Sequence, residues 1–302
     1  FDVFKSNYYD IIQTGRGGNP EYPFTQIRNT PIIDSIHIMG GIDNQYNISR
    51  VMHITKWSAD IWSKKGGDKN RVRLVSHPMI ITEGNSKSLK QELGIDTKMV
   101  FGFHQRNSDE IFSSIPLEAY KQIETDDTHF IILGASPLYQ KQAKELGIKH
   151  ITFLRYTGDK EKIYSFLQTL DVYAHGRKDG EINSTAMAEA MYFGKPIISH
   201  TSTIHNGHIE CIGEAGMVVD TVPEYVEGLK KFFNVDVLKT TSDLARAQFK
   251  KLYEAQGQME NIITIYRESV ANPYPYKIKR IISSFRIRFY LFKLMEKIKK
   301  SL

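Results

Sequence analysis

Short apolar runs alternate with amphipathic stretches along most of the chain, and this alternation constrains the fold more than any other feature. Runs such as 31–37, 99–103 and 129–133 have the length of strands that are buried on both faces. Between such runs, stretches such as 137–146 and 159–170 place apolar residues at helical spacing. Because strands that alternate with helices form parallel sheets covered by helices, we predict an α/β protein.

A polar turn at residues 94–99 divides the chain into two predicted domains. About six predicted strands follow the turn, which is enough for one doubly wound sheet, whereas four precede it. We therefore predict a partial N-terminal domain over 1–97, which includes a helix over 86–93, and a C-terminal domain over 98–270. One long helix is expected over 243–268.

The composition excludes several classes of function. Nine of the 40 Lys and Arg residues and one of the 34 acids lie in residues 271–302, so residues 1–270 carry a net charge of −2 and no nucleic-acid partner is expected. A single cysteine and the absence of CxxC or HExxH spacing predict neither a disulfide nor a zinc site. With no apolar run of membrane-spanning length, we expect a cytoplasmic protein.

The basic segment 271–302 is predicted to form an amphipathic tail. Its apolar residues recur three and four positions apart: Ile278, Ile281, Ile282, Phe285, Phe289, Phe292 and Met295. A helix of this kind lies in the headgroup plane of an anionic membrane, so we expect residues 277–300 to bind the inner face of a membrane peripherally. The alternative is a helix that packs back on the protein with its cations in solvent.

Two glutamates eight positions apart, Glu181 and Glu189, flank the start of a predicted helix over 185–193. Asn183 or Ser184 is a suitable N-cap, and the free amides of the first turn form an anion site, most naturally for phosphate. Carboxylates beside a phosphate site suit a sugar nucleotide, because one accepts hydrogen bonds from the sugar and the other from the ribose. The alternative is that Glu181 is a solvated loop acid and Glu189 a surface residue.

The context of this pair carries a family resemblance. Segment 171–200, DVYAHGRKDGEINSTAMAEAMYFGKPIISH, resembles the donor-site segment of the GT-B glycosyltransferases often called group 1 or family 4. Segments 100–120, 151–176 and 208–220 resemble the family's neighbouring stretches in the same order. The resemblance implies an α/β GT-B fold with two Rossmann-like doubly wound domains that face a cleft. Since the family's opening strands are not seen, the N-terminal domain is expected to be only partly present.

The resemblance also implies roles for particular residues. Glu181 matches the donor-sugar carboxylate and Glu189 the ribose carboxylate, and Arg106 matches an arginine that binds the diphosphate. The remaining candidates are Asn183, Ser184 and Thr185 for the phosphates, Tyr156 near the base, His104 at the cleft edge, and His37 beside the transferring sugar. The alternative for His37 is a structural histidine at the end of a strand, with its hydrogen bonds satisfied there.

One position departs from the family's pattern. The lysine that usually follows five residues after the arginine is Ile111 in this chain. We therefore expect Arg177 or Lys178 to supply the second positive charge, with a solvated loop pair as the alternative. No metal and no cofactor are expected, since such sites commonly stabilise the departing diphosphate with a helix N-terminus and cationic side chains.

The resemblance implies a glycosyltransferase that moves a hexose-type sugar from a nucleoside-diphosphate donor, such as a UDP-sugar, to a glycan, lipid-linked or other acceptor, with retention of configuration expected. Two alternatives remain open. One is a sugar-nucleotide epimerase on the same fold. The other is a non-catalytic partner subunit that binds the donor, which the missing lysine and the short N-terminal domain favour.

Overall fold

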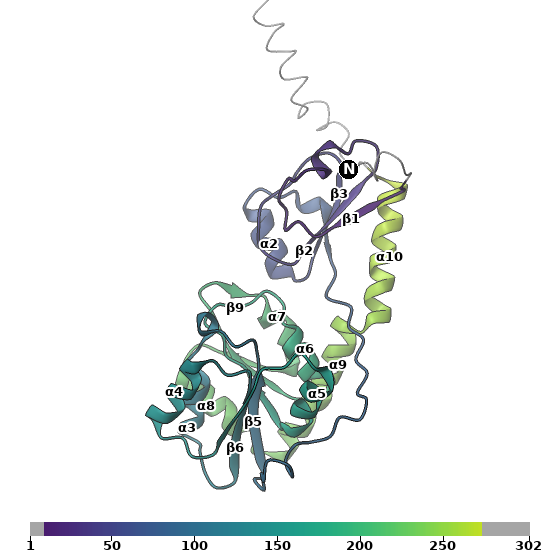
Figure 1. Cartoon of the computed structure of the whole chain (residues 1–302). Coiled ribbons are helices and arrows are strands. Elements are labelled where there is room, and N and C mark those ends of the chain that lie inside the picture. Colours follow the sequence, from purple (N-terminus) through teal and green to yellow (C-terminus); the bar gives the residue numbers. More distant parts are fainter. Residues whose placement is uncertain (1–8, 274–302) are drawn as a thin grey trace, which may run out of the picture. The chain divides into compact units, whose positions relative to one another are not determined.

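The structure, a computed structural model, describes residues 9–273 and divides into two compact units (Figure 1). Of the described residues, 9–75 and 259–273 form the smaller unit, and the larger unit runs from Ser76 to Gln258. Both contain parallel sheets covered by helices, which confirms the predicted α/β class.

The smaller unit is built on one parallel sheet in the order β1–β2–β3–β4. Its elements are β1 (Ile12–Thr14), η1 (Phe24–Gln26), β2 (Ile32–Ile36), β3 (Ile48–His53), α2 (Lys56–Lys64), η2 (Lys69–Arg71), β4 (Val72–Leu74) and most of α10 (Ala255–Ala271). Trp62 of α2 packs in a cluster with Ile32 and Val51, while Ile262 and Ile265 of α10 pack in a second cluster with other residues of β2 and β3. Successive strand residues therefore meet different helices, as the alternation of side chains along a strand requires.

The larger unit is built on a six-stranded parallel sheet in the order β12–β10–β8–β5–β6–β7. Its strands are β5 (Met99–His104), β6 (Thr128–Leu133), β7 (Ile151–Leu154), β8 (Val172–Ala174), β10 (Ile197–His200) and β12 (Gly216–Val219), with a small pair β9 (Gly180–Glu181) and β11 (His205–Asn206). Its helices are η3 (Asp109–Ile111), α3 (Ile115–Lys121), α4 (Pro137–Leu146), α5 (Lys160–Thr169), α6 (Thr185–Tyr192), α7 (His208–Ile212), η4 (Gly213–Ala215), α8 (Val222–Lys231) and α9 (Val235–Tyr253).

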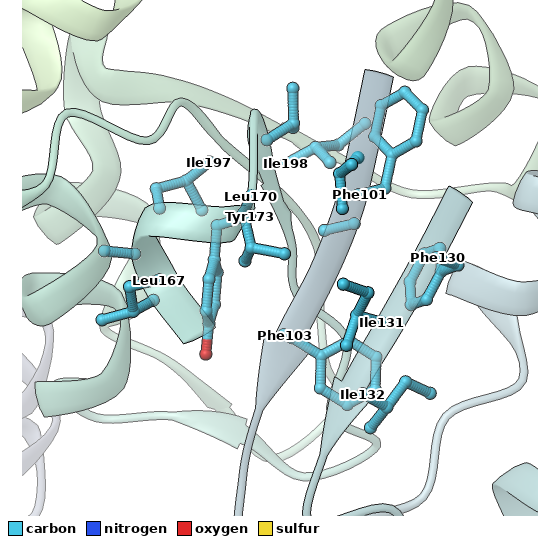
Figure 2. Packing of buried hydrophobic residues seen from close by; sticks show 14 of the residues in the cluster. Phe101, Phe103, Phe130, Ile131, Ile132, Leu167, Leu170, Tyr173, Ile197 and Ile198 are labelled. Atoms are coloured by element: carbon cyan, nitrogen blue, oxygen red, sulfur yellow. The ribbon is translucent and has the colours of Figure 1, made fainter. Parts of the chain in front are cut away.

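Helices cover both faces of this sheet, with α3, α4 and α8 on one face and α5, α6 and α9 on the other (Figure 1). The strands are therefore buried on both sides, and aromatic and branched side chains such as Phe101, Phe103 and Ile132 fill the core (Figure 2). The strand order reverses between β5 and β8. In open parallel sheets a ligand binds beyond the carboxyl ends of the strands at such a switch point.

The boundaries of the units differ from the predicted ranges 1–97 and 98–270. Residues 76–97 belong to the larger unit, where Met79 N donates to Tyr253 O at 2.8 Å and Leu89 N donates to Thr169 Oγ1 at 2.7 Å. Residues 259–273 belong to the smaller unit, because the apolar face of α10 completes its core. The predicted tail at 277–300 lies outside the described residues.

Two predicted helices are wrong. Residues 86–93 form an irregular segment that ends in turns, since the amides of Lys87 and Leu89 donate to hydroxyl groups of α5 rather than to helical carbonyls. The single helix over 243–268 is two helices, α9 and α10, because the backbone of Glu254 leaves the helical conformation (φ −56°, ψ 124°) and forms a bridge with Met79. Of the helices within residues 9–273, none combines the length and apolarity that a membrane span requires.

Candidate functional site

A pocket of about 240 Å³ lies at the switch point of the larger unit, beyond the carboxyl ends of β5 and β6. Segments far apart in the sequence line it: the residues after β5, the loop before α5, and the first turns of α5 and α6. Its polar lining includes His104, Arg106, Tyr156, Lys160, Thr185 and Glu189. The predicted donor segment therefore contributes to a real concavity at the position where α/β sheets bind ligands.

Helix α6 presents its N-terminus at this pocket. Ser184 is the N-cap, and its hydroxyl accepts a hydrogen bond from Met187 N at 3.3 Å. Thr185 and Ala186, the first two residues of the helix, line the pocket. Because the amides of a first turn lack intrahelical acceptors, this end of the pocket favours an anionic group.

Asn183 does not serve as the cap. Its side-chain nitrogen donates to Ser76 Oγ at 2.9 Å, and its side-chain oxygen accepts from the Tyr253 hydroxyl at 3.3 Å. These bonds hold the start of α6 against neighbouring parts of the larger unit, so the side chain of Asn183 has a positioning role in this structure.

Glu189 is a buried carboxylate in the second turn of α6. Its Oε2 accepts from His104 Nε2 at 3.2 Å, and its Oε1 accepts from the ammonium of Lys160. Burial alone would raise the pKa of Glu189, but the hydrogen bonds from His104 and Lys160 outweigh it and hold the pKa below 4.5. The side chain is only 4% exposed, so the alternative of a surface residue is wrong for Glu189.

The ring of His104 is fixed from the other side. The Tyr173 hydroxyl lies 3.4 Å from His104 Nδ1 and donates to the His104 carbonyl at 2.9 Å. A carboxylate can only accept, so His104 Nε2 carries the hydrogen that faces Glu189. The carboxylate of Glu189 is thus oriented by two partners: the buried ring of His104, which Tyr173 holds, and the exposed ammonium of Lys160 at the pocket.

Glu181 lies in the loop that follows β8, partly buried, at the end of β9. Arg177 Nη1 donates to its Oε1 at 3.1 Å, and His175 Nε2 lies 3.9 Å from the same oxygen. Burial raises the pKa of Glu181 above 4.5, although Arg177 acts in the opposite direction. Glu181 is therefore held within the protein and is not a solvated loop acid.

Arg177 and Lys178 do not line the pocket. Arg177 donates to both carboxylate oxygens of Asp179, at 2.9 and 2.7 Å, as well as to Glu181, so two acids compensate its single charge. Lys178 is exposed, and its backbone amide donates to the carbonyl of Ile111 at 3.2 Å. Ile111 itself is 1% exposed and packs as an apolar residue.

The other predicted residues are divided between the units. Arg106 lies two residues after the end of β5, is exposed and lines the pocket, as does Tyr156 from the loop after β7. His37 belongs to the smaller unit, where it is exposed immediately after β2. The structure therefore brings Arg106, Tyr156, Thr185 and Glu189 together, with Glu181 and Arg177 in the loop after β8.

Sequence reasoning missed Lys160. It is the first residue of α5, after the N-cap Asp159, and it lines the pocket. A cation at a helix N-terminus opposes the helix dipole, so a lysine at this position breaks a local preference. Such a departure is a signal of function that the sequence did contain.

Three buried histidines, His175, His200 and His208, surround the loop after β8. Burial lowers the pKa of each, and that of His175 lies well below 6.5. His175 Nδ1 lies 2.8 Å from Ser199 Oγ, and His200 Nε2 lies 2.7 Å from Ser113 Oγ. Across residues 9–273, no group of three His, Cys, Asp or Glu side chains is arranged to hold a metal ion.

A family model and several solved structures match this chain. The family model "Glycosyl transferases group 1" matches residues 86–251. HepE of Anabaena, solved with UDP and glucose, has a TM-score of 0.65 and 17% identity over 80% of this chain and 72% of its own. No curated protein matches the chain in sequence.

Two further structures share more of the chain. A glycosyltransferase from Rickettsia africae has a TM-score of 0.74 and 14% identity over 90% of this chain and 79% of its own. Sucrose-phosphate synthase of Thermosynechococcus elongatus has a TM-score of 0.70 and 15% identity over 89% and 76%. At these identities the likeness shows a shared fold, and the match to the family model is separate evidence from the sequence.

Proposed function

Because the chain belongs to the group 1 glycosyltransferases and has their GT-B fold, we propose that it moves a hexose-type sugar from a nucleoside-diphosphate donor to a glycan or lipid-linked acceptor. Its parallel-sheet units and its pocket at the switch point are the features on which the proposal builds.

One observation carries the proposal: a single pocket combines an anion-binding helix end, cationic side chains and a buried, ionised carboxylate. A nucleoside diphosphate has the complementary groups. Its phosphates fit the N-terminus of α6 and Arg106, whose planar guanidinium binds phosphate oxygens in pairs. Its ribose hydroxyls are donors that fit the oxygens of Glu189. Tyr156 offers an aromatic ring to the base.

The likeness to HepE favours a uracil base, since that protein was solved with UDP and with UDP-glucose. In the transfer step the bond between the anomeric carbon and the diphosphate breaks, and negative charge develops on the leaving oxygen. Arg106 and the amides of α6 stabilise that charge, which is the main electrostatic contribution expected of such a site.

We assign Glu181 to the donor sugar. It is held by Arg177 in the loop after β8, and its raised pKa reflects a partly dehydrated carboxylate that accepts hydrogen bonds from hydroxyl groups strongly. His37 remains a candidate for the transfer step. If it contributes to transfer, His37→Gln lowers turnover and leaves nucleotide affinity unchanged.

A second candidate function is donor binding without transfer. The buried, apolar Ile111 at the position of the family's lysine favours it, because the leaving diphosphate loses one source of positive charge there. Binding of a nucleoside diphosphate without consumption of any sugar donor, with a panel of acceptors present, would select this alternative. Conversion of a UDP-sugar with no acceptor present would select an epimerase.

A thermal-shift panel of UDP, GDP, ADP and their hexose derivatives tests the proposal. A ligand at about 100 times its Kd adds about 2.7 kcal/mol to the stability of the native state. For a domain of this size, that corresponds to a rise of roughly 5–10 °C in Tm. We expect one base to give this shift, and the matched nucleoside without phosphate to give a smaller one. No shift with any member would contradict the proposal.

The composition of residues 271–302 supports a membrane-associated acceptor. Nine cations and one acid in this segment attract an anionic surface, at about 1 kcal/mol per cation. We expect the protein to bind anionic liposomes in a salt-sensitive manner, and deletion of residues 274–302 to abolish this binding while UDP binding is kept. Full-length protein that ignores such liposomes at low salt would contradict the membrane proposal.

A further inference from the structure

Lys160 and Glu189 form an ion pair at the pocket in which one side chain is exposed and the other is buried. The Lys160 ammonium donates to Glu189 Oε1. The side chain of Lys160 is 60% exposed, whereas that of Glu189 is 4% exposed. The carboxylate is therefore fixed in the wall, and the lysine is the partner that is free to move into solvent or towards a ligand.

The two hydrogen-bond partners of Glu189, His104 and Lys160, also differ in burial. His104 is buried and is held by Tyr173, so its bond to Oε2 belongs to the wall. Lys160 holds Oε1, the remaining carboxylate oxygen, and both it and Glu189 line the pocket. A carboxylate oxygen has two acceptor positions, and the ammonium takes one of those on Oε1, so a ribose hydroxyl must share this oxygen with the ammonium or displace it.

We propose that Lys160 is a movable counter-ion that pairs with Glu189 before a nucleotide binds and moves to the diphosphate when one does. The move supplies a second positive charge to the phosphates and releases Oε1 to the ribose. This inference rests on the proposed donor site and adds a residue and a rearrangement to it.

Alternative sources of the second charge are poorly placed. Arg177 is held by Asp179 and Glu181, and Ile111 is apolar and buried. Among the described residues that line the pocket, the cationic side chains are Arg106 and Lys160. Lys160 at the first residue of α5 lies at the positive end of the helix dipole, so its ammonium favours an anionic partner, which is Glu189 in this structure.

The test compares Lys160→Met with wild type by titration with two ligands, UDP and uridine. Loss of a charged hydrogen bond to phosphate is expected to weaken UDP binding about 10- to 100-fold. Uridine lacks phosphate, so its affinity is expected to stay the same or to rise severalfold, because Glu189 no longer has a competing partner. If the panel selects another base, its diphosphate and nucleoside replace this pair.

Two further variants serve as controls. Lys162→Met removes an exposed lysine from the same helix, one that lies 4.0 Å from Asp159, and is expected to change neither affinity. Lys160→Arg keeps the charge and is expected to retain UDP affinity within about threefold. The melting temperatures of all variants without ligand show whether each one folds.

The outcomes are distinct. Equal weakening of UDP and uridine in Lys160→Met would mean that Lys160 only positions Glu189, and unchanged UDP affinity would mean that it does not contact phosphate. Either result overturns this inference alone when the wild type binds UDP. A wild type that binds no nucleoside diphosphate overturns the proposed function as well.

Discussion

Replacement of Glu189 separates its role in the fold from its role in binding. In Glu189→Ala, the Nε2–H group of His104 loses its acceptor within a buried region, which costs about 1–3 kcal/mol. For a unit of this size, each kcal/mol lowers Tm by roughly 2–4 °C. In Glu189→Gln, the amide oxygen still accepts from His104 and the exposed Lys160 turns to solvent, so we expect a loss below about 1 kcal/mol.

The pH dependence of this stability has a definite sign. The pKa of Glu189 is lowered in the folded protein relative to 4.5. Its contribution is therefore present above pH 4.5 and is lost as the pH falls through the folded-state value. We expect the stability difference between wild type and Glu189→Gln to shrink in that acid range, as measured by thermal unfolding at a series of pH values.

Unlike stability, UDP affinity is not expected to distinguish the two variants. Both variants are expected to weaken UDP binding about 10- to 100-fold, since each removes a charged acceptor for the ribose. The matched control is Glu145→Gln, an exposed carboxylate on α4 of the same unit. If Glu189→Gln bound UDP as wild type does, the ribose assignment would be wrong, and an unchanged Tm in Glu189→Ala would refute the argument from His104.

Three further predictions concern Arg106, Glu181 and Lys195 of the larger unit. Arg106→Ala is expected to weaken UDP binding about tenfold or more while uridine binding is unchanged, and equal affinities in wild type and variant would remove Arg106 from the diphosphate site. Glu181→Gln is expected to reduce turnover more than UDP affinity, and equal losses in both would show that our division of roles between the two glutamates is wrong. Burial lowers the pKa of Lys195 from 10.5 to about 8, so between these values the unfolded state binds more protons and the wild type gains stability with pH. Relative to Lys195→Met, this gain is measured by chemical unfolding at pH 8 and pH 10, and a constant difference would refute it.

The local chemistry of the chain was enough to predict much of this structure. The alternation of apolar runs with amphipathic stretches predicted the α/β class. Small residues around Glu189 predicted α6, and the candidates for its N-cap were narrowed to Asn183 and Ser184, of which the structure selects Ser184. These features depend on neighbours within one or two turns of the backbone. The family resemblance added the GT-B fold, which the comparisons bear out.

The parts that were not predicted depend on contacts between distant segments. Lys160 and Glu189 lie on two different helices and are 29 positions apart in the sequence, and no spacing rule identifies such a pair. The helix breaks at Glu254, where the backbone forms a bridge with Met79. In residues 86–93, the amides of Lys87 and Leu89 donate hydrogen bonds to hydroxyl groups of α5 instead of to carbonyls of a helix of their own. The unit boundary was misplaced for the same reason, since it depends on which core α10 completes.

The most direct test of the donor-site account is a structure of the protein with the nucleoside diphosphate that the thermal-shift panel selects. The account predicts phosphates at the N-terminus of α6 beside Arg106, with Lys160 displaced towards them. It also predicts ribose hydroxyls at hydrogen-bond distance from Glu189. A nucleotide bound outside this pocket, or a ribose that makes no contact with Glu189, would contradict it.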